Sequence, residues 1–278
     1  MFSWQHFVWL GICALLVAFA IIRYRKGSAS LNQVLNICCI ICVLSEFTKV
    51  FGVIEMVPSA DGSIIYPYIP MNHLPLHLCS IQILLIFYVR FVAKGNAREN
   101  LLSFMYPSCL LGALAALAMP SIFSTSITVD QAFTHPMAYQ FFIYHAMLIA
   151  LGLIIAMCGE VEWEWKHWRN CLIIIALAGF ISLYINSMFA SPTYLNGELQ
   201  HIDFWPNFFF TYQNPLGIKL TKITHWYIYL VILSVLIIVL TWICFMPVIK
   251  KNRNKEDKDL KWTLCQGQFI KKHLSSDF

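Results

Sequence analysis

The amino-acid sequence predicts an all-α fold: a polytopic membrane protein built as a bundle of seven transmembrane helices. Its composition gives the first indication, because 59% of the 278 residues are hydrophobic and only 12% are charged, whereas a soluble domain carries about 25% charged residues. The second indication is a series of apolar stretches, each long enough to cross a bilayer. The third is the uneven distribution of Lys and Arg among the segments that join these stretches.

A transmembrane helix needs about 20 mostly apolar residues. The first candidate stretch precedes the basic residues Arg23, Arg25 and Lys26, and it has neither a basic segment before it nor a small-residue cleavage site. It is therefore predicted to be a retained helix and not a cleaved signal peptide. The seven predicted spans lie at about residues 5–22, 33–56, 74–93, 101–119, 137–157, 170–190 and 224–246.

Sixteen of the 19 Lys and Arg residues lie on one side of the predicted bundle. The exceptions are Lys49 inside the second span, and Lys219 and Lys222 in the loop before the last span. Because basic loops stay in the cytoplasm, the N-terminus is predicted to be outside and the C-terminus cytoplasmic, with the protein in the cell membrane. In this interpretation residues 1–249 form the transmembrane domain. Residues 250–278 form a basic cytoplasmic tail, either an interfacial helix on the inner leaflet or a solvated segment.

Polar side chains of five predicted spans converge on the outer half of the bundle, whereas the inner half carries few. At 1.5 Å per residue, Cys79 lies roughly 7 Å and His145 roughly 12 Å below the outer boundary. Polar groups buried in hydrocarbon are costly unless they are paired, so they face a wet cavity or one another. A functional cavity is therefore predicted in this layer, with interhelical hydrogen bonds as the structural alternative. Other polar residues of the layer are Glu46, Lys49, Tyr139, Gln140, Asn186, His225 and Tyr227.

Two pairs of polar residues have simple interpretations. Glu46 and Lys49 are three residues apart, and they are predicted to neutralise one another on one helix face. His73 and His77 have the i, i+4 spacing that holds a metal ion when a third ligand is supplied. No nearby carboxylate completes such a site, so no metal is predicted.

Most of the ten cysteines lie in or beside apolar segments, where a free Cys behaves as a small hydrophobe. Cys79 differs because it lies at the start of the third span, two residues after His77. These two side chains point apart, about 200° around a helix, so a base for a Cys79 nucleophile must come from another helix. His145 is the candidate at the matching depth, and a Cys–His pair activates a thiolate. Inert packing of Cys79 remains open on these grounds.

The loop at 191–223 is rich in aromatic residues. A segment this apolar is poorly suited to water, so it is predicted to fold back over the bundle as a lid or as an interfacial element beside lipid.

Three segments carry a resemblance to a known family: "LPLHLC" at 74–79, "YQFFIYHAMLI" around His145, and "NPLG…HWYIY" at 214–229. Together with the seven spans they resemble the YwaF-like bacterial integral membrane proteins, which are related to the animal transmembrane protein 164 acyltransferases. The resemblance covers about residues 5–246. It implies an enzyme, a membrane-embedded acyltransferase that moves a fatty acyl chain between lipids through a Cys thioester with a His general base. It places the catalytic pair at Cys79 and His145.

This resemblance implies a membrane phospholipid as acyl donor and acceptor, within the lipid bilayer, and neither a cofactor nor nucleic acid is expected. The backbone amides near Leu78 and Cys79 are candidate oxyanion donors. The side chains predicted for oxyanion stabilisation or substrate binding are His77, Tyr139, Gln140, Asn186 and His225.

Two functions without catalysis remain as alternatives. The first is a small-solute transporter, and the second is a lipid-binding or receptor-like membrane protein. A transporter would show repeated halves with matching broken helices. Pro75 and Pro107 lie in adjacent spans and have no matching pair later in the chain, which favours the enzyme.

Overall fold

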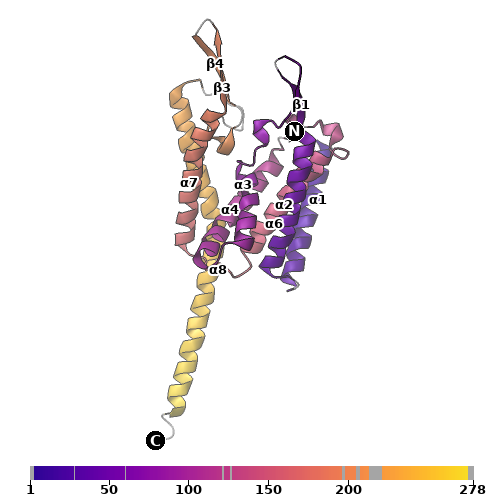
Figure 1. Ribbon diagram of the computed structural model, residues 1–278. Helices are drawn as coiled ribbons and strands as arrows, with labels where there is room; N and C mark the ends of the chain where they lie inside the picture. Colours follow the sequence, from indigo (N-terminus) through magenta and orange to yellow (C-terminus); the bar gives the residue numbers. More distant parts are fainter. Residues whose placement is uncertain are drawn as a thin grey trace.

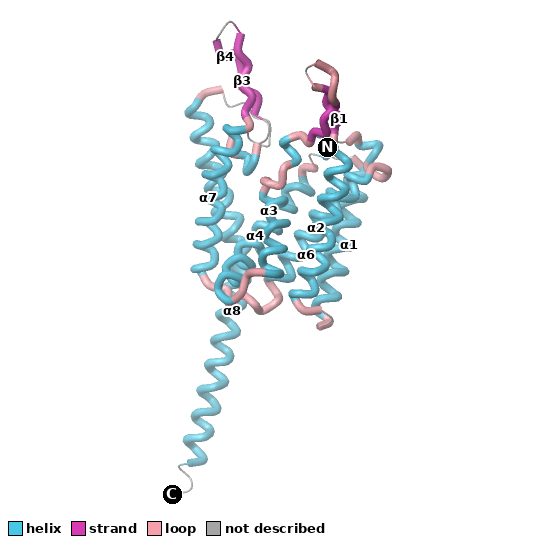
Figure 2. Tube along the Cα trace, in the orientation of Figure 1, coloured by secondary structure: helices cyan, strands magenta, loops and turns pink. Residues whose placement is uncertain are grey.

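A computed structural model describes residues 3–27, 29–59, 61–120, 122–125, 127–195, 198–204, 207–212 and 221–274. Seven of the helices in these ranges have 14 or more residues, and they confirm the predicted all-α bundle (Figures 1 and 2). A four-residue helix, α5 (Ile122–Thr125), and a 3-10 turn, η2 (Val129–Gln131), precede the sixth helix. The long helices are α1 (Trp4–Arg25), α2 (Leu31–Val53), α3 (Leu78–Phe91), α4 (Gly95–Ala118), α6 (Pro136–Ile155), α7 (Trp165–Met188) and α8 (Ile223–Leu274).

Six helices of the described ranges are long and apolar enough to cross a membrane, namely α1, α2, α4, α6, α7 and the Ile223–Arg253 part of α8. Large apolar side chains cover their outer faces, such as Leu15 at 73% exposure and Phe51 at 66%. Exposed apolar surface of this extent is unfavourable in water, whereas the hydrocarbon of a bilayer solvates it. The outer surface of the bundle is therefore suited to lipid.

The third predicted span, 74–93, is shorter in the structure. Helix α3 has 14 residues and begins at Leu78, with His77 as its N-cap residue. A 3-10 turn, η1 (Met71–His73), and a non-helical stretch precede it, because Pro75 disfavours helical geometry in the residue before it. Cys79 consequently lies in the first turn of α3, directly after the non-helical stretch.

Helices α4 and α6 form the centre of the bundle. They pack directly on each other, α1 and α2 pack on α6, and α3 and α7 pack on α4. One close approach involves Gly152 of α6, where a Cβ atom would lie 2.9 Å from Leu110 Cγ and 3.0 Å from the carbonyl oxygen of Tyr106. The lack of a side chain at Gly152 is what allows the two central helices to approach this closely.

Both β-hairpins lie at the end of the bundle where α1 begins (Figure 1). Strand β1 (Glu55–Pro58) pairs antiparallel with β2 (Ile65–Tyr68), and β3 (Ala190–Leu195) pairs antiparallel with β4 (Glu198–Phe204). This end is called the hairpin end below, and the opposite one, where α1 ends at Arg25, is called the basic end. That the hairpin end is extracellular stays a prediction from the distribution of basic residues.

The segment 191–223, predicted to be a lid, folds back only in part. Strands β3 and β4 form a hairpin that extends beyond the helices (Figure 2). Residues 207–212, which include the 3-10 turn η3 (Phe208–Phe210), return to the helices. Residues 213–220 lie outside the described part of the chain. The predicted cover over the bundle is thus reduced to the short η3 segment.

Helix α8 is longer than the predicted span 224–246. It has 52 residues and continues to Leu274, projecting away from the bundle at the basic end (Figure 1). The predicted basic tail therefore starts as a direct continuation of the last helix. Its contact with a lipid leaflet stays a prediction.

Candidate functional site at the hairpin end

Cys79 lies in the first turn of α3, half-buried and packed against the central cluster of apolar side chains. Its sulfur faces α4 at Gly112, where an added Cβ atom would lie 3.0 Å from Sγ. Gly112 therefore leaves the space that the thiol occupies. The first-turn amides of α3 face no capping side chain, so this helix end has hydrogen-bond donors and a partial positive charge beside the thiol.

Tyr144 of α6 connects Cys79 to the centre of the bundle. Its hydroxyl donates a hydrogen bond to the carbonyl oxygen of Cys79, at 2.8 Å. Its ring also lies edge-on to the ring of His145, with 5.5 Å between centroids. Tyr144 was not predicted as a site residue. Its position directly before His145, the predicted base, is the sequence feature that could have indicated it.

His145 is buried in α6, beside the ring of Phe141. Its Nδ1 lies 2.6 Å from the carbonyl oxygen of Phe141. Because a carbonyl only accepts hydrogen bonds, Nδ1 carries the proton of the neutral ring, and Nε2 has the lone pair. No described residue forms a hydrogen bond with Nε2. The ring is thus held in the tautomer whose Nε2 can accept a proton.

The predicted pair of Cys79 and His145 is not joined directly. Within the described residues no hydrogen bond links the thiol to the imidazole, and Tyr144 is their common neighbour. Catalytic hydrogen bonds are often long or unformed without substrate and tighten in the complex. The structure therefore places both residues around one tyrosine, and the pairing itself stays a prediction.

Tyr139 and Gln140, predicted beside the pair, point to other elements. The Tyr139 hydroxyl donates to the carbonyl oxygen of Phe133 at 2.8 Å. The Gln140 side chain crosses to α2, where its Nε2 donates to Ser45 Oγ at 2.7 Å. Neither side chain is thus directed at Cys79, although Gln140 contributes to a neighbouring groove.

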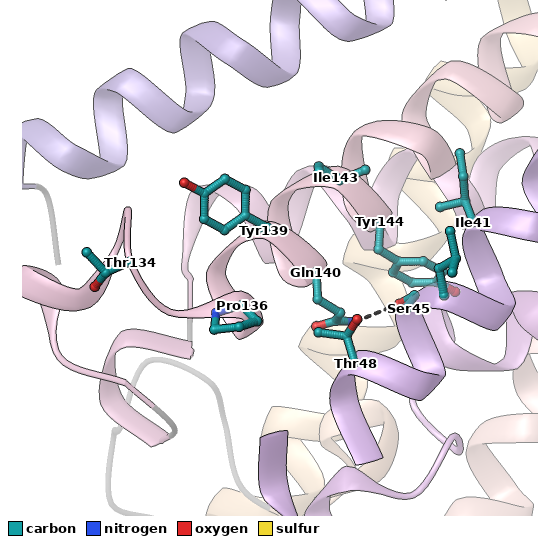
Figure 3. A pocket seen from close by; sticks show the side chains of 10 residues that line it. Ile41, Ser45, Thr48, Thr134, Pro136, Tyr139, Gln140, Ile143 and Tyr144 are labelled. Carbon is teal, nitrogen blue, oxygen red and sulfur yellow. Dashed lines mark hydrogen bonds between the residues drawn. The ribbon is translucent and has the colours of Figure 1, made fainter. Parts of the chain in front are cut away.

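A groove of about 410 Å³ lies between α2 and α6, and Figure 3 shows the Gln140–Ser45 hydrogen bond within it. Tyr144 is part of its wall, so the groove and Cys79 share this residue. No lining residue is charged. The residues that line the groove are Ile41, Leu44, Ser45, Thr48, Thr134, Pro136, Tyr139, Gln140, Ile143 and Tyr144.

The side-chain amide of Asn186, predicted to bind substrate or an oxyanion, forms hydrogen bonds within the protein instead. It is fully buried in α7, donates to the carbonyl oxygen of Phe208 and to Thr211 Oγ1, and accepts from the Phe208 backbone N–H at 2.9 Å. These bonds hold the η3 segment, in which Phe209 and Phe210 have positive φ angles that are unusual for non-glycine residues. Asn186 is therefore better explained as the anchor of this segment.

The η3 segment reaches the start of α3. The ring of Phe208 lies edge-on to the ring of His77, with 4.8 Å between centroids. His77 thus lies two residues before Cys79 in the sequence and contacts the η3 segment in the structure. His225, by contrast, is exposed at the start of α8 and has Thr221 as its neighbour.

Glu46 and Lys49 form the predicted ion pair, with 2.7 Å between Lys49 Nζ and Glu46 Oε2. The prediction that they neutralise each other is confirmed. Their charges are therefore satisfied within α2.

Two further sets of polar contacts were not predicted from the sequence. Gln82 of α3 donates to Ser108 Oγ and accepts from the Cys109 thiol. At the basic end, the Arg98 guanidinium bonds Glu160, Asn32 and the carbonyl oxygen of Val89, a set called the Arg98 cluster below. Both sets join different helices, so their partners cannot be read from spacing along one helix.

The fold and this site define a polytopic α-helical membrane protein with a cysteine, a tyrosine and a histidine grouped near one end of the bundle. A model of the TMEM164 family matches residues 1–245. The protein belongs to the TMEM164 family, which confirms the predicted relation to the transmembrane protein 164 proteins. Assignment to the bacterial YwaF branch stays a prediction. Comparison with curated proteins and with solved structures gives no match.

Proposed function

We propose that this protein is a lipid acyltransferase of the cell membrane, which moves a fatty acyl chain from one phospholipid to another through a thioester on Cys79. The observation that carries the proposal is the arrangement around Tyr144. This residue bonds the backbone of Cys79 and lies against His145, whose Nδ1 contact keeps Nε2 in the basic form. These contacts support Cys79 as the nucleophile and His145 as the base, with Tyr144 as their common neighbour.

The first half of the reaction acylates the cysteine. His145 Nε2 takes the proton of the Cys79 thiol, and the thiolate attacks the ester carbonyl carbon of the donor lipid. The tetrahedral intermediate then expels the alkoxide of the donor, which recovers the proton from the imidazolium. The products are a Cys79 thioester and a lysophospholipid.

The second half transfers the acyl group. His145 removes the proton of a hydroxyl on the acceptor lipid, whose oxygen attacks the thioester carbonyl. The intermediate releases the Cys79 thiolate, which takes the proton back from His145. The net reaction exchanges one ester for another and uses no cofactor.

Each tetrahedral intermediate carries a negative oxygen that needs hydrogen-bond donors. The first-turn amides of α3 are suited to this, because no side chain caps the helix at His77 and the helix dipole favours negative charge there. Backbone amides are fixed before the reaction, so they need no reorganisation as the charge develops. Asn186 does not serve in this mechanism, since both of its amide atoms hold the η3 segment.

The test is intact-protein mass spectrometry after the purified protein is incubated with phosphatidylcholine. The native protein is expected to gain one acyl mass that hydroxylamine removes, as a thioester requires. Cys79→Ala is expected to lose the adduct, and His145→Gln to slow its formation by about 10²-fold or more, which is typical for a general base.

Cys171→Ala is the matched control, because Cys171 is buried in α7 and belongs to no part of the proposed site. It is expected to retain the adduct. An adduct that persists in Cys79→Ala would refute the proposed nucleophile. A native protein that is never acylated would leave the transporter or lipid-binding function as the better explanation.

A further inference from the structure

The groove between α2 and α6 has two kinds of lining. Its rim is apolar and exposed, with Leu44 at 60% and Ile143 at 38% exposure. Its inner part is polar, with Ser45, Thr48 and Gln140 close together (Figure 3). Both helices are long enough to span a bilayer, so an opening between their exposed faces leads to lipid and not to bulk water.

The polar part of the groove has hydrogen-bonding capacity to spare. The Gln140 amide has two N–H donors, and Ser45 Oγ is its partner for only one. The Thr48 hydroxyl forms no hydrogen bond with any described residue. Uncommitted polar groups that face hydrocarbon are unfavourable, so a polar part of a ligand at this place would satisfy them.

The lining also indicates which part of a ligand fits. None of the ten residues is charged, which disfavours an ion, a free phosphate or a charged solute as the occupant. An uncharged ester with a hydrocarbon chain matches the combination of amide, hydroxyl and apolar groups. A volume of about 410 Å³ is within the range of sites for small ligands, large enough for this part of a lipid but not for a whole diacyl phospholipid.

We propose that the groove between α2 and α6 binds the glycerol ester and upper acyl chain of one membrane phospholipid, which enters laterally from the bilayer. The ester carbonyl accepts hydrogen bonds from Gln140 and Thr48, and the chain lies along Ile41 and Ile143. The phosphate headgroup stays outside the groove, at the membrane surface.

The inner wall connects this lipid site to Cys79. Tyr144 lines the groove and also bonds the Cys79 carbonyl, so one side chain connects the groove to the backbone of Cys79. That the groove supplies the acyl donor rests on the proposed function. The binding of lipid itself does not depend on it.

The experiment uses the full-length protein in nanodiscs of phosphatidylcholine that contain phosphatidylcholine with a diazirine on one acyl chain. After photolysis, cross-linked peptides are located by mass spectrometry. Cross-links are expected to concentrate on residues 41–48 and 134–144, well above those on Leu177, Phe180 and Tyr184, which are exposed on α7. Equal labelling of both surfaces would overturn the proposal, because it would show ordinary boundary lipid only.

Two variants test the geometry. Ile143→Trp fills the groove and is expected to remove most of the groove labelling, whereas Ile40→Trp, on an exposed position of α2 outside the groove, is expected to leave it unchanged. Thr48→Val keeps the shape and removes one hydroxyl, so the ratio of groove labelling to α7 labelling is expected to fall, by up to about fivefold. Unfolding midpoints measured in parallel identify any variant that fails to fold.

Measuring the acyl adduct on Cys79 distinguishes a failure of the proposed lipid site from a failure of the proposed acyltransferase function. If the groove is labelled and Cys79 is never acylated, the lipid site stands and the acyltransferase does not. If Ile143→Trp forms the adduct at the native rate, the donor does not enter by this groove, and the proposed route is wrong.

Discussion

The two ends of the bundle differ in whether all of their polar side chains are satisfied within the protein. At the basic end, the three bonds of Arg98 join α4 to α2, to α3 and to the loop that precedes α7. At the hairpin end, the Nε2 of His145 and the hydroxyl of Thr48 form no hydrogen bond with any described residue.

A polar group whose bonds are satisfied within the protein contributes to stability, whereas one with remaining capacity can bind a ligand. The difference indicates that the Arg98 cluster holds helices together at the basic end, and it is consistent with the proposed chemistry at the hairpin end. Substitutions at the two ends should therefore separate stability from activity.

Arg98→Met is expected to have the largest effect on stability. It removes three hydrogen bonds that join different segments, so unfolding should become easier by about 3 kcal/mol. Chemical denaturation in detergent measures this. Lys166→Met, which removes an exposed ion pair with Glu164, should cost less than about 1 kcal/mol. Equal losses in the two variants would show that the Arg98 cluster has no special role.

Gly152→Ala tests the central contact between α4 and α6. An added methyl group would lie 3.0 Å from a backbone oxygen of Tyr106, which cannot move aside as a side chain can, so about 2 kcal/mol of stability should be lost. Gly179→Ala, in α7 with nothing near its Cβ position, should instead gain up to about 1 kcal/mol from helix propensity. Thermal unfolding of both proteins checks the sign of each change.

Tyr144→Phe tests most directly whether substitutions at the hairpin end affect activity more than stability. It removes one hydrogen bond to the Cys79 carbonyl, so stability should fall by only about 1 kcal/mol. Acylation of Cys79 should fall by about tenfold or more, since a misplaced nucleophile loses more in rate than in stability. Folded Arg98→Met protein should show the reverse pattern. A Tyr144→Phe variant with native acylation would assign the tyrosine a purely structural role.

The smallest effect concerns the β1–β2 turn at the hairpin end. Hydrogen bonds from Ser59 and Ser63 lower the pKa of Asp61 from 3.8 to about 2. The folded pKa is below the unfolded one, so the turn's stabilisation is complete above about pH 4 and lost as the pH falls toward 2. Hydrogen exchange of the Ser63 amide, which bonds Asp61, should accelerate relative to its intrinsic rate over that interval. Asp61→Asn should remove this dependence, and a transition near pH 4 would contradict it.

The sequence was a reliable guide to contacts within one helix and to features that follow from apolar composition. Six of the seven predicted spans follow from apolar length, and the Glu46–Lys49 pair follows from i, i+3 spacing. The orientation, the catalytic pair and the lipid substrate stay predictions that the experiments above address.

The contacts between helices could not be predicted in the same way. Gln140 meets Ser45 and Asn186 meets Phe208 because of how each helix is rotated about its axis. A span that is apolar all round has no strongly polar face to indicate that rotation. The sequence therefore gives the position of each polar residue along its helix, while the direction of its side chain required the structure.

The length of α3 has a consequence for the bilayer itself. Fourteen residues give a helix of about 21 Å, whereas the hydrocarbon core is about 30 Å thick. Such hydrophobic mismatch is relieved by local thinning of the membrane around the short segment. Non-helical backbone at membrane depth also requires protein or water around it, and the stretch before Leu78 is of this kind. Both effects would bring the polar surface of the bilayer toward Cys79, which would let a lipid ester reach the thiol of the proposed reaction without leaving its leaflet.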